Sequence, residues 1–386
     1  MMGEKKNIWI FAGETSGDMY GAELAKSLVK TYSGNVAISG MGGKAMKEAG
    51  VNIIIDSTEL GVVGLVEVLK SIFKFISIFR FLVKKAESER PDAVIFIDYP
   101  GFNLRFAKQM HKRNLKVIWY VSPQIWAWGK KRIYKLAEYC TKMLVIFPFE
   151  VDYYREKTNL DVEFVGHPLV DIVKSKLDPN IKRDMDKLLI LPGSRFSEIN
   201  RVLVPLLETA LLIKKHHTNL KLKISAARPS IEERIREIAE QFIANRKVEL
   251  PFEIECGNNL KLLQECGTGL SKSGTVTVEA AIVGIPLVVY YKLNPITFII
   301  AKMIITLFRN SFVMPNIIAN KVIYEEFQQH TGTSKALAEA IERILPGGER
   351  REYVISEIEN LTNNMLTFGK HQASDNAAEA VKRTLA

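Results

Sequence analysis

One stretch in the second half of the chain, Leu270–Tyr291 (LSKSGTVTVEAAIVGIPLVVYY), constrains the fold more than any other. Its hydroxyl side chains and Gly274 stand before a short apolar segment, which predicts a loop that leads into a helix. Gly284 and Pro286 end that helix, and Leu287–Tyr291 is typical of a buried parallel strand. Such a helix start offers free N–H groups to a phosphate. The alternative is an ordinary capped helix, and the stretch alone does not decide.

Strand, glycine loop and helix follow one another in both halves of the chain. The first unit is Asn7–Ala12 with the loop Gly13–Asp18, and the second is Leu188–Leu191 with the loop Pro192–Glu198. The polar, proline-containing segment Ile172–Asp186 between them indicates a linker. The sequence therefore predicts an α/β protein with two Rossmann-like domains that face each other across a cleft. The first loop does not have the spacing Gly-x-Gly-x-x-Gly, which disfavours a dinucleotide.

A chain of 386 residues is long enough to build two separate cores. We expect an N-terminal domain over 1–171 and a second domain over 187–346. A polar helical tail over 347–386 either crosses back to the first domain or is exchanged with a second subunit of a homodimer. The sequence does not choose between these arrangements.

The composition narrows the class of partner. A formal net charge of +10 indicates an anionic one: phosphate groups, anionic lipid or nucleic acid. Nucleic acid is disfavoured, because no basic base-reading helix and no aromatic-rich sheet motif is recognisable. The three cysteines form no Cys-x-x-Cys pair, so neither a disulfide framework nor a zinc site is expected, and a reducing cytoplasm fits. No stretch reaches the ~20 apolar residues that span a bilayer.

A carboxylate ends one predicted buried strand. The segment Pro91–Asp98 is apolar until its last residue, and ligands of open α/β sheets bind at the carboxyl ends of strands. Asp98 is therefore either a helix cap or a general base. His167, after a later strand, either polarises a substrate group or is simply packed in its loop.

Two loops of the second half are candidates for anion binding through backbone N–H groups. In the loop Gly193–Glu198, Arg195 offers a planar fork for a diphosphate, or else pairs with Glu198 on the surface. The other loop is Ser271–Thr275, and Glu279 lies one helical turn further on, where a carboxylate could accept hydrogen bonds from a ribose. No Walker loop is present, which disfavours ATP-type phosphoryl transfer.

Aromatic and basic residues share one predicted helix, Lys70–Glu87. It is either a core helix with solvated basic ends or an interfacial helix whose aromatic residues contact acyl chains while its cations meet anionic headgroups. In the second case the contacts are expected from Phe75, Phe79, Lys74 and Arg80. Pro295–Phe308 is a second apolar stretch with the same two alternatives.

Motifs over nearly the whole chain resemble those of one enzyme family. They are GETSGDMYGAEL (13–24), GVVGLVEVL (61–69), IDYPGFN (97–103), YVSPQIWAW (120–128), FPFE (147–150), FVGHPL (164–169), LPGSRFSEI (191–199), SGTVTVEA (273–280) and MPNIIA (314–319). The chain resembles the lipid-A-disaccharide synthase family, inverting glycosyltransferases of family 19 with the GT-B fold.

The resemblance implies UDP-2,3-diacylglucosamine as donor and 2,3-diacylglucosamine 1-phosphate as acceptor. The products would be UDP and the β-1,6-linked lipid A disaccharide 1-phosphate. The reaction would take place in Gram-negative bacteria at the cytoplasmic face of the inner membrane, whose anionic surface the protein would contact peripherally. We expect no cofactor and no metal.

The family's motifs also carry roles onto residues of this chain. The essential aspartate falls on Asp98, as general base, and the arginine of the Gly-Ser-Arg motif falls on Arg195, on the UDP side. Further UDP-side candidates are Gly193, Ser194, Ser273, Gly274, Thr275, Glu279, Asn316 and Gln329, and acceptor-side candidates are Gly13, Glu14, Ser16, Gly17 and Asn103. The family often has aspartate where this chain has Gly101, which leaves Asp98 as the lone candidate base in its loop.

Overall fold

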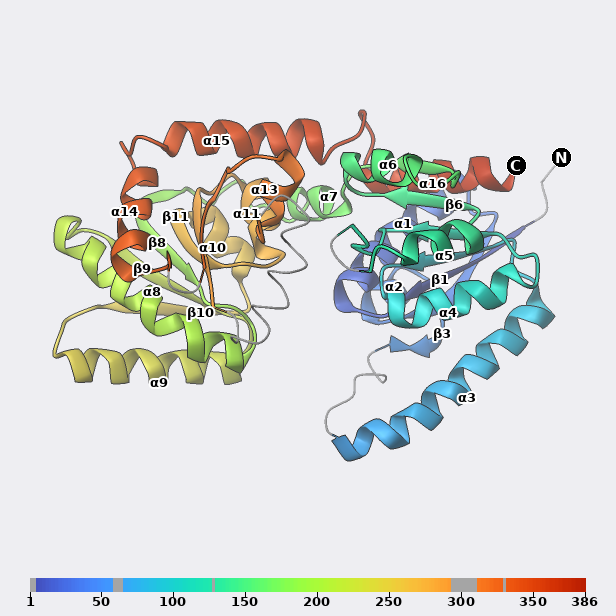
Figure 1. The fold of residues 1–386 in the computed structure, drawn as a ribbon, viewed down its shortest axis with the longest axis horizontal. Helices are drawn as coiled ribbons and strands as arrows, with labels where there is room; N and C mark the ends of the chain where they lie inside the picture. The colour runs from blue at the N-terminus through green and yellow to red at the C-terminus, as the bar shows by residue number, and fades with distance from the viewer. Residues whose placement is uncertain (1–4, 58–64, 127–128, 293–310, 329–330) are drawn as a thin grey trace. The chain divides into compact units, whose positions relative to one another are not determined.

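The structure is a computed structural model that describes residues 5–57, 65–126, 129–292, 311–328 and 331–386, with side chains from 75 onward in the helix that begins at 65. The chain forms two compact units, Met1–Pro168 with Leu366–Ala386, and Leu169–Met365. Each unit is built on a parallel sheet with helices packed against it (Figure 1). The predicted fold class, α/β with two Rossmann-like domains, is confirmed.

The first unit has a seven-stranded sheet in the order β3-β2-β1-β4-β5-β6-β7. Because the strand order reverses between β1 and β4, the loops that follow these two strands border the crevice in which such sheets bind ligands. The strands are β1 (Lys6–Ala12), β2 (Val36–Gly42), β3 (Asn52–Asp56), β4 (Ala93–Ile97), β5 (Val117–Tyr120), β6 (Lys142–Val145) and β7 (Val162–Phe164).

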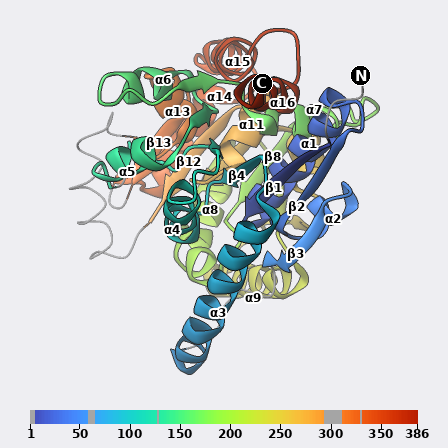
Figure 2. The ribbon, with the colours of Figure 1, turned by 90° about the vertical axis from the view of Figure 1, so that its right-hand side faces the viewer.

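Helices cover both faces of this sheet, and Figure 2 shows α1 and α4 on opposite sides of it. One face carries an aromatic core in which Phe11 and Phe96 of the strands pack against Phe106 of α4. The last helix of the chain, α16, packs against α1. The helices are α1 (Thr15–Thr31), α2 (Lys44–Glu48), α3 (Leu65–Glu89), α4 (Pro100–His111), α5 (Arg132–Tyr139), α6 (Pro148–Arg155) and α16 (Ala373–Leu385).

The second unit has a six-stranded parallel sheet in the order β10-β9-β8-β11-β12-β13. Its central strand β11 reaches Lys272, so the expectation of a loop from Leu270 onward was wrong for the first three residues. The strand was not predicted because it is rich in glycine and small polar residues, which have a low β-propensity. It forms because β8 pairs with it on one side and β12 on the other. The strands are β8 (Asp184–Leu191), β9 (Lys221–Ala226), β10 (Phe252–Cys256), β11 (Cys266–Lys272), β12 (Leu287–Tyr291) and β13 (Glu325–Gln328).

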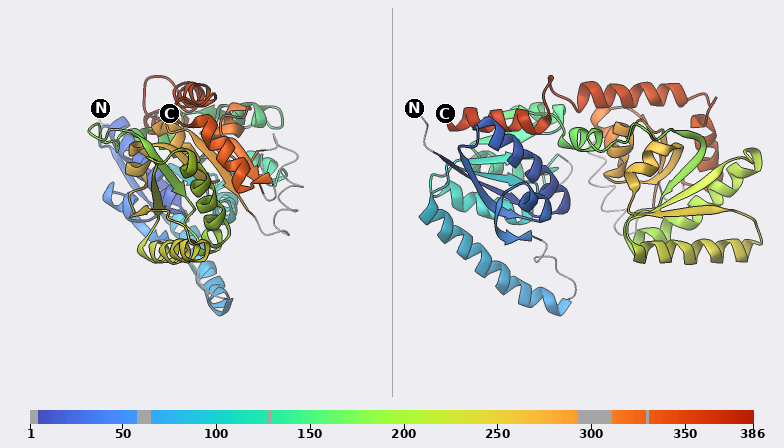
Figure 3. Two further views of the ribbon diagram at one scale, coloured as in Figure 1. Left: turned by 90° about the vertical axis from the view of Figure 1, so that its left-hand side faces the viewer. Right: turned by 180° about the vertical axis from the view of Figure 1, so that it is seen from behind.

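Helices surround this second sheet as well, and Figure 3 shows the unit from two further sides. They are α7 (Pro168–Lys174), α8 (Phe196–His216), α9 (Pro229–Arg246), α10 (Asn259–Glu265), α11 (Val276–Val283), α13 (Met314–Ala319), α14 (Ser334–Ile344) and α15 (Arg351–Asn360), followed by a π-helical turn over Leu361–Met365. The tail is divided: α15 belongs to the second unit, and the chain from Leu366 belongs to the first. In the described part of the chain no helix is both long and apolar enough to cross a membrane.

Candidate active site

The chain makes a strained turn where β4 ends. Asp98 and Tyr99 both have positive φ angles, 42° and 47°, which non-glycine residues rarely adopt. The Asp98 N–H donates to the carbonyl of Val121, which follows β5 and also has a positive φ, 63°. Such conformations cost of order 1–3 kcal/mol each and persist where the surrounding structure over-determines them, commonly at functional sites.

Asn103 holds this turn from within the protein. Its side chain is fully buried, and Nδ2 donates to the carbonyls of Ile97 at 3.3 Å and of Asp98 at 2.8 Å. We expected Asn103 to contact the acceptor, and this expectation needs correction. A side chain without solvent exposure that binds two backbone carbonyls fixes the position of Asp98 instead.

The environment of Asp98 suits a base. Burial of the carboxyl is the largest cause that raises its pKa, the charge of Glu14 raises it further, and a hydrogen bond from the Tyr99 backbone lowers it, so that the pKa is about 6. A carboxylate with a pKa close to the working pH is a better proton acceptor than an ordinary one and is still ionised at neutrality.

The first glycine loop lies beside this turn. A Cβ atom on Gly13 would lie 2.3 Å from the ring of Tyr99, so only glycine lets the ring lie there. Glu14 is exposed at the start of α1, and Ser16 is half-buried in its first turn. Gly17 is buried, and a Cβ there would meet Ala12 and Ile97 at ordinary contact distances. Gly17 is thus buried against β1 and β4, which corrects its expected contact with the acceptor.

One buried residue of this loop was missed. The Asp18 carboxylate accepts hydrogen bonds from the backbone N–H groups of Gly43, Ala45 and Met46, at 2.7 to 3.1 Å, and so caps α2. An aspartate at the end of a Gly-x-x-x-Gly-Asp loop could have indicated a capping residue. The sequence does not show, however, that the helix it caps is α2.

The second unit contains a cavity of about 440 Å³ at the carboxyl ends of its strands. It is lined by the β8–α8 and β11–α11 loops together with residues that follow β9 and β10. Seven of the expected UDP-side residues line it, namely Gly193, Ser194, Arg195, Ser273, Gly274, Thr275 and Glu279. Loops that lie far apart in the chain thus meet at one edge of the sheet, as doubly wound topology requires.

Arg195 lines this cavity and lies near Glu198, as the second alternative considered for it predicts, while its contact with a diphosphate stays a prediction. Its side chain is 79% exposed, and Nη1 lies 3.7 Å from Oε1 of Glu198. Glu279 is largely buried, which raises its pKa, while a hydrogen bond with Asn259 lowers it. Ser271 does not belong to the helix start as expected, because it is buried in β11 and its hydroxyl donates to the Lys272 carbonyl. Lys272 also lines the cavity, and our sequence analysis did not single it out.

Asn316 does not line this cavity. It borders a separate one of about 390 Å³, and its side chain is occupied by the backbone: Oδ1 accepts from the N–H groups of Ile323 and Tyr324, and Nδ2 donates to the Tyr324 carbonyl. It lies in α13. The expected contact with UDP is therefore corrected to a structural role. Gln329 and the apolar stretch Pro295–Phe308 lie outside the described residues.

Burial decides between the two roles considered for His167. His167 is packed between the rings of Tyr20 and Phe147, and burial lowers its pKa to about 3, so it is neutral. Phe75 and Phe79 of α3 are half-buried where they pack against the core of the first unit, and their expected contact with lipid stays a prediction. Arg80 is exposed, and the side chain of Lys74 lies outside the described part of α3.

Among the residues that the structure describes, no group of three or more His, Cys, Asp or Glu side chains is placed to hold a metal ion.

Two Rossmann-like units, one with a carboxyl group of raised pKa and the other with a cavity at two glycine loops, define an enzyme of the GT-B class. Solved structures of this architecture include a putative UDP-N-acetylglucosamine 2-epimerase from Listeria monocytogenes (TM-score 0.66, 11% identity, 98% of this chain and 96% of that chain covered). A glycosyltransferase from Rickettsia africae also matches (TM-score 0.60, 14% identity, 99% of each chain). At such identities the likeness establishes the fold alone.

Sequence comparison is more specific. The family described as Lipid-A-disaccharide synthetase matches residues 8–381. Lipid-A-disaccharide synthases from Trichlorobacter lovleyi and Coxiella burnetii are 37% and 35% identical, over 90% and 97% of this chain and 90% and 98% of theirs. The chain belongs to the lipid-A-disaccharide synthase family, as its motifs predicted, and it is a glycosyltransferase.

Proposed function

We propose that the protein transfers 2,3-diacylglucosamine from UDP-2,3-diacylglucosamine to the 6-hydroxyl of 2,3-diacylglucosamine 1-phosphate. Family membership supports the substrates. The observation that carries the mechanism is Asp98, a carboxyl group held in a strained turn at the carboxyl end of β4 with a pKa of about 6.

In this mechanism Asp98 accepts the proton of the acceptor 6-hydroxyl. The oxygen forms its new bond to the anomeric carbon while the bond from that carbon to UDP breaks, and UDP leaves with the electron pair. A single in-line displacement inverts the anomeric centre and gives the β-1,6 linkage. General base catalysis of this kind contributes roughly 10²–10⁴-fold.

The cavity of the second unit would hold the donor. Its volume of about 440 Å³ lies in the usual range for small-molecule sites. Arg195 and the N–H groups at Ser273–Thr275 would stabilise charge on the departing UDP, at roughly 3–4 kcal/mol for a well-placed donor. Glu279, which borders the same cavity, would accept hydrogen bonds from the ribose. A UDP co-structure exists for a relative of the same fold, the Staphylococcus aureus protein MnaA.

We also propose that the protein works at the cytoplasmic face of the inner membrane, bound peripherally to its anionic surface. The net charge of +10 supports this location. Helix α3 supports it as well, because Ile76 and Phe81 are exposed there beside the exposed cations Arg80 and Lys84. A homodimer is compatible with this proposal.

The test is an assay with both lipid substrates. Purified protein incubated with UDP-2,3-diacylglucosamine and 2,3-diacylglucosamine 1-phosphate should release UDP and form a disaccharide 1-phosphate, as detected by mass spectrometry. Formation of neither product, together with turnover of plain UDP-N-acetylglucosamine, would reject the proposal in favour of an epimerase, an activity that relatives of the same fold carry in their names.

A further inference from the structure

Lys272 and Glu198 form an ion pair inside the cavity of the second unit. Nζ of Lys272, at the end of β11, lies 3.1 Å from Oε1 of Glu198, in the first turn of α8. The two side chains are only 27% and 18% exposed, so solvent screens the pair less than a surface pair. Both residues line the cavity.

The Glu198 carboxylate has two more partners in the cavity. Its Oε2 accepts a hydrogen bond from the Ser194 N–H at 3.4 Å, and its Oε1 lies 3.7 Å from Nη1 of Arg195. One carboxylate is therefore bound by an ammonium group, a guanidinium group and a backbone amide. These are the groups that proteins use to bind the oxygens of a phosphate.

The backbone is shaped to admit this carboxylate. Gly193 has a φ of 106°, and a Cβ atom there would lie 2.6 Å from Oε2 of Glu198. Any other residue at this position would be strained and would also push the carboxylate away. The position of Glu198 over the β8–α8 loop is thus a consequence of the glycine in that loop.

A carboxylate at this place opposes a bound diphosphate. Like charges a few ångströms apart repel each other more strongly at a protein surface than in bulk water, because the effective dielectric constant there is lower. A diphosphate that entered the cavity would meet this repulsion unless it replaced the carboxylate on its three partners. The chemistry of the partners allows that exchange, because each of them donates hydrogen bonds to anionic oxygen.

We propose that Lys272 binds the diphosphate of the donor, and that Glu198 is an internal competitor that holds Lys272, Arg195 and the Ser194 N–H until a nucleoside diphosphate displaces it. The proposal rests on the proposed function in that it takes the cavity to be the donor site. The inference gives the donor site a second positively charged side chain besides Arg195, and it explains why an acidic residue lines a site for an anion. Uridine, which has no phosphate, does not compete with Glu198.

The test is calorimetric titration of the full-length protein with UDP and with uridine. Lys272→Met should weaken UDP binding by about tenfold or more, because a charge-assisted hydrogen bond is lost, and should leave uridine binding unchanged. Lys272→Arg, which keeps the charge, should retain most of the UDP affinity. Glu198→Gln should strengthen UDP binding several-fold, because an amide of the same shape no longer repels the diphosphate.

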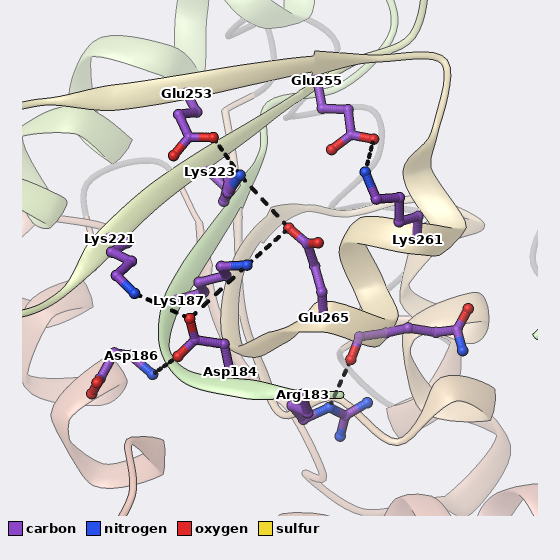
Figure 4. Close-up of polar contacts among 11 residues, drawn as sticks. Arg183, Asp184, Asp186, Lys187, Lys221, Lys223, Glu253, Glu255, Lys261 and Glu265 are labelled. Carbon is purple, nitrogen blue, oxygen red and sulfur yellow. Dashed lines mark hydrogen bonds and ion pairs between the residues drawn. The ribbon is translucent and has the colours of Figure 1, made fainter. Parts of the chain in front are cut away.

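Lys221→Met is the matched control. Lys221 belongs to a group of ion pairs in the same unit, where its Nζ lies 3.4 Å from Asp184 near Lys187, Lys223 and Glu265 (Figure 4). None of these residues lines the cavity. Removal of this lysine lowers the net charge by the same amount as Lys272→Met and should leave UDP binding unchanged.

The outcomes separate the inference from the proposed function. UDP binding that Lys272→Met leaves unchanged, or that Glu198→Gln weakens, would overturn the inference while UDP remains a ligand. Melting curves that match the unaltered protein are required of each variant, and Lys272→Arg provides a second comparison if Lys272→Met is unstable. Failure of the unaltered, folded protein to bind UDP would overturn both the inference and the donor site.

Discussion

Glu14 and Asp98 follow the neighbouring strands β1 and β4, and the charge of Glu14 raises the pKa of the Asp98 carboxyl. After burial it is the largest cause of the rise. The two carboxyl groups lie at the same edge of the first sheet, since the strands are parallel and paired in register from Ile8 opposite Ala93 to Ala12 opposite Ile97. A second acidic group thus makes the candidate base a stronger one.

This relationship predicts the pH profile. Asp98 accepts a proton only when it is ionised, so kcat/KM should fall as the pH drops below about 6, where its pKa lies. Glu14→Gln removes a negative charge that raises this pKa, so the acid limb should move to lower pH. Glu23→Gln, on the same helix α1 but paired with Lys26, is the control and should leave the limb in place. An acid limb that does not move in Glu14→Gln would contradict the assignment of Asp98 or of its neighbour.

Asp98→Asn should lower turnover by about 10²-fold or more and leave UDP binding intact, because a base is lost and the donor cavity is untouched. The same variant should be more stable than the unaltered protein at about pH 8. The folded-state pKa of about 6 lies above the ordinary 3.8, so the unfolded chain ionises first and the carboxyl costs stability as the pH rises from about 4 to above 6.

The gain should be about 1–3 kcal/mol at about pH 8 and should vanish at about pH 3, below the ordinary pKa of 3.8, where Asp98 is protonated in both states. Thermal melts at the two pH values measure it. Equal melting temperatures of the two proteins at about pH 8 would argue that Asp98 is not desolvated, and full activity of Asp98→Asn would remove it from the mechanism.

Substitution by alanine should lower turnover at one glycine beside the turn and leave it unchanged at another. Gly13→Ala would place a Cβ atom 2.3 Å from the Tyr99 ring, so the ring must move and the strained turn at Asp98 with it. We expect turnover to fall by at least tenfold in this variant. A Cβ on Gly101 meets nothing within 4 Å, so Gly101→Ala should retain activity. Steady-state kinetics of both variants would show the contrast, and equal effects would argue against a role for the Tyr99 ring.

The sequence predicted the architecture because short apolar runs such as Pro91–Asp98 and Leu287–Tyr291 are typical of buried parallel strands and are bordered by turn residues or polar residues, such as Pro286 before the second run and Asp98 at the end of the first. It failed at β11, where Cys266–Lys272 contains two glycines and no β-branched apolar residue. Such a strand is specified by the two strands that pair with it rather than by its own residues.

For the candidate site, the sequence predicted position where a motif places a residue on a loop after a strand, as at Asp98 and Arg195. It was not predictable where function depends on the direction of a side chain. Asn103 and Asn316 stand in motifs of the family, yet both turn inward and bind backbone carbonyls or N–H groups. Lys272 was overlooked because the strand before Ser-Gly-Thr was missed, and with it the fact that the strand's last side chain lines the cavity.

The last prediction concerns helix α3 and the membrane. From residue 75 onward, where its side chains are described, the exposed large apolar ones are Ile76 and Phe81, at 42% and 51%. The ring of Phe79 instead contacts Phe102 and Phe106 edge-on at centroid distances of 5.7 Å. Ile76→Ser combined with Phe81→Ser should therefore reduce flotation with vesicles that contain an anionic phospholipid, without a change in melting temperature.

Phe79→Ser should instead lower the melting temperature, because it empties part of the core, and should leave flotation unchanged. Tyr134→Ser, which removes an aromatic ring that is 62% exposed on α5, is the control for the loss of an exposed ring and should leave flotation unchanged. If flotation is equal for the unaltered protein and the Ile76/Phe81 variant, α3 does not contact lipid through this surface, and the charge of the protein alone would have to account for its attachment.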